Sequence, residues 1–254
     1  MMQRKLLLLN RGGGYASYIT ASNPLLWHRM RDTTGTTSTN SGSLGATGNG
    51  VIAGTTALAQ IGKLGANEAF DFDGTTSIIT VANTAALANM TTQRWMFLCK
   101  PDTLGEGNSG RLFSWGSFGA NNHLFSLLAT NNIILTVRGD GGADALAQTT
   151  SGIMADCIGA WCMIFGDYDD ADALGLGRRC RMWKSVGGVV TPITTLANNT
   201  ALTGNVRNQT LDLCLGNSSG VAQTFDGLFD EVVCNAGMLW TLAEITAIAR
   251  AAGV

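Results

Sequence analysis

The two histidines, His28 and His123, are the first residues to test for chemistry, because imidazole serves both acid–base catalysis and metal binding. His28 lies in the strand-like run LLWHRM, and His123 stands at a turn before LFSLL. Neither has the neighbouring histidine or cysteine pair that a metal site needs. The chain has no G-x-S-x-G motif for a serine hydrolase, and its glycine-rich turns lack the context of a phosphate loop.

Carboxylates could serve a glycosidase, which needs two of them about 5–10 Å apart. The glutamates are Glu68, Glu106, Glu231 and Glu244, and no two of them share the spacing of neighbours on one face of a strand. Two acids from separate loops could converge, but the sequence gives no sign of it. We therefore predict that the protein is not an enzyme.

The densest acidic run is DYDDAD, which contains Asp167, Asp169 and Asp170. Carboxylate oxygens are the ligands that calcium prefers, so calcium is the one cofactor that the sequence allows. The alternative is a solvated turn between two strands, and it is favoured because the chain has no longer acidic loop. Asp230 and Glu231 lie within an apolar run, where the simplest interpretation is that they accept backbone N–H bonds.

The chain has six tryptophans, which could stack on sugar rings as aromatic platforms do. Trp115 and Trp240 stand nearest to predicted turns and are the candidates for carbohydrate binding. The others lie in apolar strand-like runs, where core packing is expected. These are Trp27, Trp95, Trp161 and Trp183.

Six cysteines could form three disulfides, but most of them lie within apolar runs such as WMFLCK and LDLCLG. Cysteine in such runs behaves as a small hydrophobic residue. We predict buried free thiols, in keeping with synthesis in a reducing cytoplasm. The residues are Cys99, Cys157, Cys162, Cys180, Cys214 and Cys234.

The low charge and the short apolar runs of the sequence exclude two classes of partner, nucleic acids and membranes. Only 13% of the residues are charged, and the net charge is −2, so no basic field is present to hold nucleic acid. No stretch approaches the roughly 20 apolar residues of a membrane span, which predicts no membrane insertion. The apolar run after Arg4 and Lys5 is too short for an export signal, which predicts synthesis in a cytoplasm without general secretion.

Short runs of β-branched and aromatic residues, separated by Gly, Asn, Asp and Ser, predict many strands. The runs WMFLC and WCMIF are continuously apolar, as expected for strands that are covered on both faces. The predicted strands are Leu25–Arg29, Ala69–Asp73, Ser77–Val81, Arg94–Lys100, Arg111–Trp115, Leu124–Ala129, Ile133–Arg138, Trp161–Tyr168, Cys180–Ser185, Val189–Ile193, Thr210–Leu215 and Gly227–Cys234.

One helix is predicted at the C-terminal end, where Thr241 and Glu244 have the spacing of a capping box and Gly253 can end the helix. Ile245 and Ile248 should dock it over an open end of the sandwich. A shorter helix is predicted over Tyr15–Ala21. Between Thr33 and Gly54 the polar, glycine-rich sequence predicts a long loop or irregular edge.

The order of these motifs resembles that of laminin-G-like, concanavalin A-like jelly-roll domains. The resemblance covers residues 15–254 and implies an all-β jelly-roll sandwich with a short C-terminal helix, preceded by an arm at residues 1–14. The motifs that carry it are PLLWHRMRDTTGTT, FDFDGTTSIITVANTAAL, RWMFLCKPDT, RLFSWGS, NIILTVR, AWCMIFGDYDD and FDGLFDEVVCNAGMLWTLAEITAIA.

The resemblance, the low charge and the missing catalytic set favour a non-enzymatic virion structural protein of a tailed bacteriophage. It would be a capsid decoration protein or a tail appendage, present in many copies and bound to the major capsid or tail proteins. Lectin-like adhesion to host surface glycans is compatible with this role. The alternative is a bacterial carbohydrate-binding or adhesion module, and a jelly-roll glycosidase comes third.

The arm contains four consecutive leucines, followed by Gly12, Gly13 and Gly14. An exposed apolar segment of this kind is expected to meet a partner. We predict that the arm attaches the protein to a virion, while the alternative is an extra strand on its own sandwich. The residues are Leu6, Leu7, Leu8 and Leu9.

Overall fold

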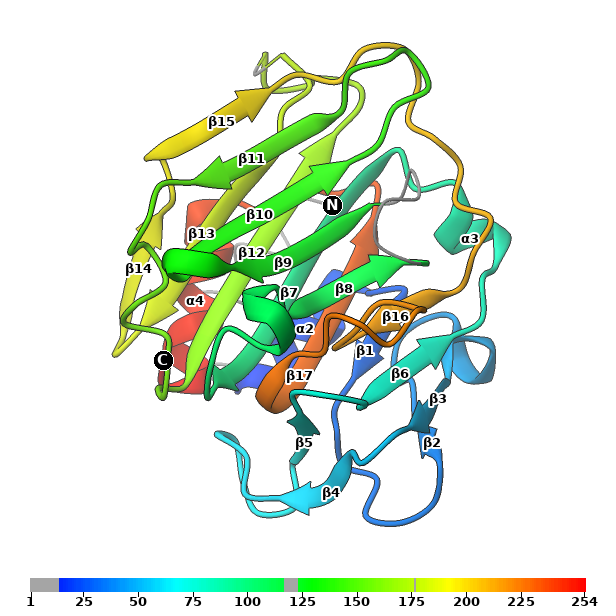
Figure 1. Ribbon diagram of the computed structural model, residues 1–254, viewed down its shortest axis with the longest axis vertical. Helices are drawn as coiled ribbons and strands as arrows, with labels where there is room; N and C mark the ends of the chain where they lie inside the picture. The colour runs from blue at the N-terminus through cyan, green and yellow to red at the C-terminus, as the bar shows by residue number, and fades with distance from the viewer. Residues whose placement is uncertain (1–13, 117–122, 176) are drawn as a thin grey trace.

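The computed structural model describes residues 14–116, 123–175 and 177–254 (Figure 1). Two antiparallel sheets face each other and enclose the main hydrophobic core. The predicted arm residues Leu6, Leu7, Leu8 and Leu9 lie outside the described residues. The all-β sandwich expected from the motifs is thus confirmed.

Sheet A has eight strands in the order β14-β13-β12-β7-β17-β5-β4, with β1 paired to β17. Its longest members, β7 and β17, run side by side through the middle of the sheet. The strands are β1 (Leu26–His28), β4 (Ala57–Gln60), β5 (Ala69–Asp73), β7 (Thr92–Pro101), β12 (Cys162–Asp169), β13 (Arg181–Val186), β14 (Val189–Pro192) and β17 (Asp226–Ala236).

Sheet B has nine strands in the order β15-β11-β10-β9-β8-β16-β6-β3-β2. They are β2 (Thr37–Ser38), β3 (Gly50–Ala53), β6 (Ile78–Val81), β8 (Arg111–Trp115), β9 (Leu124–Leu128), β10 (Asn132–Val137), β11 (Ala145–Thr149), β15 (Leu196–Thr200) and β16 (Leu213–Leu215). The helices are α2 (Tyr15–Ser22), α3 (Ala85–Ala88) and α4 (Leu242–Ala252), with 3-10 turns η1 (Gly45–Gly48), η2 (Glu106–Asn108) and η3 (Ala129–Asn131).

The sequence of β7 is continuously apolar because both faces of the strand are buried. Trp95 and Phe97 point into the core between the sheets, where the Trp95 ring centroid lies 4.1 Å from that of Phe113. Met96 and Leu98 point the other way, into a second cluster beneath α2 and α4. The expectation that this strand is covered on both faces is confirmed.

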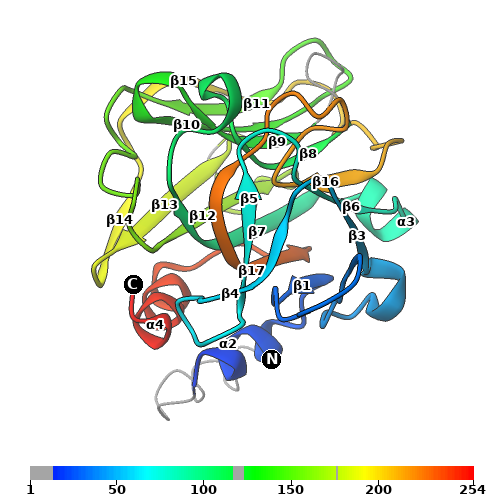
Figure 2. The same cartoon turned by 60° about the horizontal axis from the view of Figure 1, so that its bottom comes forward.

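Helix α4 begins and ends where the sequence predicts. Thr241 and Glu244 form the capping box, and Gly253 adopts the left-handed conformation at the C-cap. Ile245 and Ile248 are buried, but the helix packs beside α2 on the outer face of sheet A, as Figure 2 shows, and not over an open end. The reason is that the outer side chains of β7 and β12 are apolar and need a cover.

Three sequence-based expectations need correction. The segment 33–54, predicted as a long loop or irregular edge, forms an edge of sheet B with the short strands β2 and β3 and the turn η1, so the loop alternative is wrong. Strands β4, β11 and β15 were not predicted, since their polar and small residues (ALAQ, ALAQT and LANNT) give a weak apolar signal. All the strands that were predicted are present, with ends shifted by up to three residues.

The six cysteines are all buried and free, as predicted. Cys99 and Cys162 are paired across β7 and β12 with their Sγ atoms 3.9 Å apart. No helix in the described part of the chain is long and apolar enough to cross a membrane.

Candidate ligand-binding groove

A groove of about 500 Å³ runs along the side of the sandwich where sheet A ends at β14. This volume lies within the range of about 300–1,000 Å³ that is usual for small-ligand pockets. One wall is the segment 152–156, and the other is formed by β14 and the residues after it. The lining residues are Gly152, Ile153, Ala155, Asp156, Lys184, Thr191, Pro192, Ile193, Thr194 and Thr195.

The first wall is held in place by side chains that reach the core. Met154 and Cys157 are fully buried there, on either side of the exposed Ala155 and Asp156. The backbone N–H groups of Gly152 and Met154 donate to carbonyls of η3, over 2.8 and 2.9 Å. The wall is therefore part of the folded framework, which lowers the entropic cost of binding.

The second wall follows from the pairing of β13 with β14, which sets Lys184 opposite Thr191. Beyond β14, the N–H of Ile193 donates to the carbonyl of Met182 over 2.9 Å. The buried Ile193 side chain anchors the segment that then crosses from sheet A to sheet B.

An ion pair crosses the groove between its two walls. Lys184 donates from Nζ to the Ile153 carbonyl and to Oδ1 of Asp156. The Lys184 side chain is 13% exposed and that of Asp156 is 53% exposed, so the lysine lies at the base and the aspartate at the rim. The two opposite charges of the groove are thus paired with each other, and the Asp156 side chain remains half exposed to solvent.

Three threonines, Thr191, Thr194 and Thr195, add exposed hydroxyl groups to the same walls. Ile153 and Pro192 add small apolar surfaces beside them. Hydroxyl groups both donate and accept hydrogen bonds, so this lining suits a polar ligand with many hydroxyls. The sequence analysis missed the groove because its walls come from distant segments without a recognisable motif.

The two tryptophans predicted to bind carbohydrate do not line the groove, and their expected exposure is wrong. Trp115 is 0% exposed and packs edge-on against Trp95 and Phe113 in the core. Trp240 is 3% exposed, and its Nε1 donates to the Trp95 carbonyl. Proximity to a turn misled the prediction, because a residue at a strand end can still point into the core.

The predicted calcium ligands have separate partners. Asp167 pairs with Arg181, and Asp170 pairs with Arg178. Asp169 accepts hydrogen bonds from the Thr92 hydroxyl and from two backbone N–H groups of its own turn. Across the described residues, no group of three His, Cys, Asp or Glu side chains could hold a metal ion. The run therefore forms a hydrogen-bonded turn, and the calcium interpretation is wrong for these residues.

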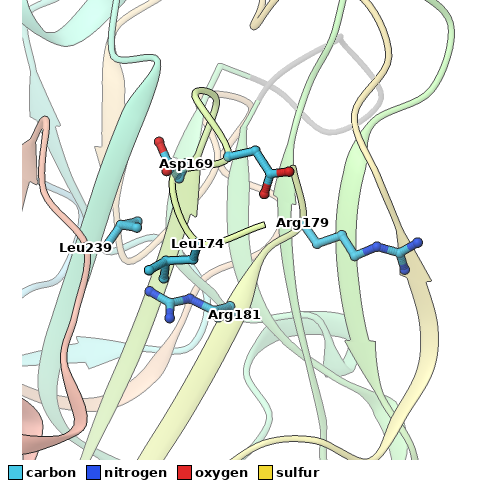
Figure 3. Close-up of a pocket in the computed structure, with 6 residues that line it drawn as sticks. Asp169, Leu174, Arg179, Arg181 and Leu239 are labelled. Atoms are coloured by element: carbon cyan, nitrogen blue, oxygen red, sulfur yellow. The ribbon is translucent and has the colours of Figure 1, made fainter. Parts of the chain in front are cut away.

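A small hollow beside this turn is shown in Figure 3. Its lining residues are Asp169, Asp172, Leu174, Arg179, Arg181 and Leu239. Its charged groups do not converge on a common point. Arg179 extends away from Arg181 and donates to the Asn199 carbonyl of β15. Arg181 is engaged with Asp167. The two guanidinium groups therefore do not form a common site for a ligand.

A second acidic pair, Asp230 and Glu231, lies on the outer face of sheet A because β17 contains a bulge between Phe229 and Glu231. The bulge sends two successive side chains to the same face, where the Leu64 N–H donates to Asp230 and the Trp27 indole N–H donates to Glu231. Both acids are 0% exposed. Burial raises the pKa of Asp230 to about 7 and that of Glu231 to about 8.

The histidines are also sealed within the protein. Burial lowers the pKa of His28 to about 4 and that of His123 to about 3, so both are neutral at physiological pH. His28 bonds through Nδ1 to Ser38, and His123 bonds through Nδ1 to Gln93. These contacts hold the sandwich together, and neither imidazole lines the groove.

Neither a protein-family model nor a curated protein matches the sequence. Solved structures match the fold. Domain 4 of AbnA, a GH43 extracellular arabinanase from Geobacillus stearothermophilus in complex with arabinotriose, is 20% identical with a TM-score of 0.54, covering 89% of this chain and 98% of that one.

The CBM40 domain of the Ruminococcus gnavus IT-sialidase, bound to α2,3-sialyllactose, is 12% identical with a TM-score of 0.50 and covers 72% of this chain and 96% of that one. The binding domain of botulinum neurotoxin DC in complex with SialylT is 9% identical with a TM-score of 0.59, covering 91% and 52%. The chain spans about half of the toxin domain. At these identities the comparisons establish the jelly-roll fold.

Proposed function

We propose that the protein is a non-catalytic carbohydrate-binding module that holds a glycan in the groove beside β14. The observation that carries the proposal is the groove itself, because its volume, its three threonines and its exposed ion pair suit a ligand with many hydroxyl groups. The comparisons support it, since similar folds are solved with arabinotriose and with sialyllactose.

A binding role agrees better with the carboxylates than a hydrolytic one does. Hydrolysis of a glycoside requires two carboxyl groups that reach the sugar from opposite sides of the scissile bond. Asp156 is the one carboxylate among the residues that line the groove. Asp230 and Glu231 have no exposed surface through which a sugar or a water could reach them.

A glycan array followed by calorimetry tests this proposal. The wild type should bind at least one oligosaccharide, with arabinotriose and sialyllactose as the first soluble probes. Ala155→Trp should abolish binding, because Ala155 is an exposed groove residue whose replacement by an indole fills the space. Ala53→Trp is the matched control, since Ala53 is an exposed alanine of β3 that does not line the groove.

The outcome that contradicts the proposal is equally plain. Equal binding by the wild type and Ala155→Trp would place the glycan elsewhere, and no binding to any glycan would rule out the function. Circular dichroism on both variants shows whether the fold is retained.

The virion role predicted from the sequence stays a prediction. It was inferred from the resemblance, the low charge and the missing catalytic set, and its predicted attachment residues Leu6, Leu7, Leu8 and Leu9 lie outside the described residues. Deletion of residues 1–13 tests it: attachment predicts a stable domain that no longer joins the particle. Mass spectrometry of purified virions would detect the protein itself.

A further inference from the structure

The charged groups of the groove form a balanced set. Among its lining residues only Lys184 and Asp156 carry charge, and they are paired with each other. A ligand therefore meets one ammonium and one carboxylate whose attraction is already satisfied. An anionic ligand that approaches the lysine also approaches the Asp156 carboxylate.

The hydrogen-bonding capacity that remains is complementary to hydroxyl groups. An ammonium has three donors, and two of those on Lys184 are taken by Ile153 and Asp156. Asp156 uses Oδ1 for this pair, and within the described residues no group donates to its Oδ2. One hydroxyl of a sugar can accept from Lys184 while its neighbour donates to Asp156.

A sugar carboxylate matches this arrangement poorly. It can only accept hydrogen bonds, so it can accept from Lys184 but cannot donate to Oδ2 of Asp156. It also brings a second negative charge close to the Asp156 carboxylate, and such repulsion is a common source of specificity. The threonines are neutral and do not offset that repulsion.

We propose that the Lys184–Asp156 pair makes the groove selective for neutral glycans with adjacent hydroxyl groups, and that Asp156 is the residue that rejects sugars bearing a carboxylate. This inference rests on the proposed function and names the class of ligand for the same site. It distinguishes between the two kinds of glycan in the similar structures, arabinotriose and sialyllactose.

The test uses an array that carries each glycan with and without a terminal sialic acid. The wild type should bind neutral members at least ten-fold more tightly than their sialylated counterparts. Asp156→Asn should raise the ratio of sialylated to neutral affinity at least ten-fold, because the amide removes the negative charge that faces the sugar carboxylate. Lys184→Met should weaken neutral binding at least ten-fold without a gain on the sialylated glycans.

Lys184 also holds the wall at Ile153, so its loss could act through the loop. Lys184→Arg keeps the charge and the donors and should retain the neutral preference. Salt gives a further readout: wild-type binding of a neutral glycan should change little between 50 mM and 500 mM NaCl, whereas the sialylated binding gained by Asp156→Asn should weaken with salt.

The inference is overturned if the wild type binds sialylated and neutral glycans equally, or if Asp156→Asn leaves the preference unchanged. Failure of the proposed function gives a different result, since the wild type would then bind no member of either set. Each result is therefore assigned to one of the two proposals.

Discussion

Two regions with carboxylates, one on sheet A and one beyond its edge at β14, differ in how deeply they are buried. Asp230 and Glu231 lie on its outer face beside β1 and segment 62–65, and have no exposed surface. Asp156 stands at the rim of the groove beyond β14, where half of its side chain meets solvent. Both regions contain the carboxylates that a glycan-binding or glycan-cleaving protein uses. The comparison shows that the burial of a carboxylate, more than its residue type, decides whether it can contact a ligand.

The burial of Asp230 and Glu231 has a direct electrostatic consequence. Burial favours the protonated form of a carboxyl, and it raises the pKa of both Asp230 and Glu231 despite the hydrogen bonds that they accept. The nearest cation, Arg29, approaches Glu231 at 3.6 Å and does not offset the loss of water. At the groove, Asp156 is half exposed and pairs with Lys184.

The largest expected effect on stability comes from shortening a buried side chain of α4, which packs on the outer face of sheet A. Ile245→Ala should lower the free energy of unfolding by roughly 2–5 kcal/mol, because Ile245 is fully buried between α4 and the sheet. Urea titration measures this loss. Leu242→Ala in the same helix is the control and should cost less than about 1 kcal/mol, since Leu242 is 54% exposed. Similar losses in the two variants would show that α4 packs differently.

The next effect is the pH dependence that the buried acids impose. Between pH 6.5 and 8 the unfolded chain has lost the protons of both acids, while the folded protein loses them only as the pH passes about 7 and 8. The folded state binds more protons, so stability should fall as the pH rises, by at most about 1.4 kcal/mol per pH unit for each carboxyl. Melting temperatures across this range measure the fall.

A double variant assigns the pH effect to these acids. Asp230→Asn with Glu231→Gln cannot ionise and should flatten the profile between pH 6.5 and 8. The two histidines do not confuse this range, because their lowered pKa values make stability rise with pH only below about 6.5, the ordinary value for histidine. A profile with the same slope in the wild type and the double variant would assign the dependence to other groups.

The sequence predicted those features that depend on neighbours along the chain. The apolar runs of β7 and β12 indicated strands buried on both faces, and Thr241 with Glu244 indicated the start of α4. Proximity to a turn says nothing about which face of a sheet a side chain occupies, and so Trp115 and Trp240 were misplaced.

Features that arise from distant segments could not be predicted. The groove forms where residues 152–156 meet β13 and β14, and the contact between Lys184 and Asp156 spans 28 positions. The bulge that turns Asp230 and Glu231 to one face is also a property of pairing with β7. A local sequence pattern does not show which strand will lie beside it. The surroundings of Asp156 and of Asp230 and Glu231 therefore became visible only in the structure.

The smallest expected effect on stability is that of a substitution at the groove. It gives the most direct comparison of the two regions. Asp156→Asn should change the free energy of unfolding by less than about 0.5 kcal/mol at every pH from 6.5 to 8, because Asp156 is half exposed and solvent weakens its ion pair with Lys184. Asp230→Asn, the same chemical change in the covered region, should raise stability at pH 8, where the wild type must keep a buried carboxylate ionised. Urea titrations at pH 6.5 and pH 8 compare the two variants directly. A pH-dependent change in Asp156→Asn, or none in Asp230→Asn, would contradict the contrast. If both results hold, any change in glycan preference in Asp156→Asn arises in the groove, because the stability of the fold is then unchanged.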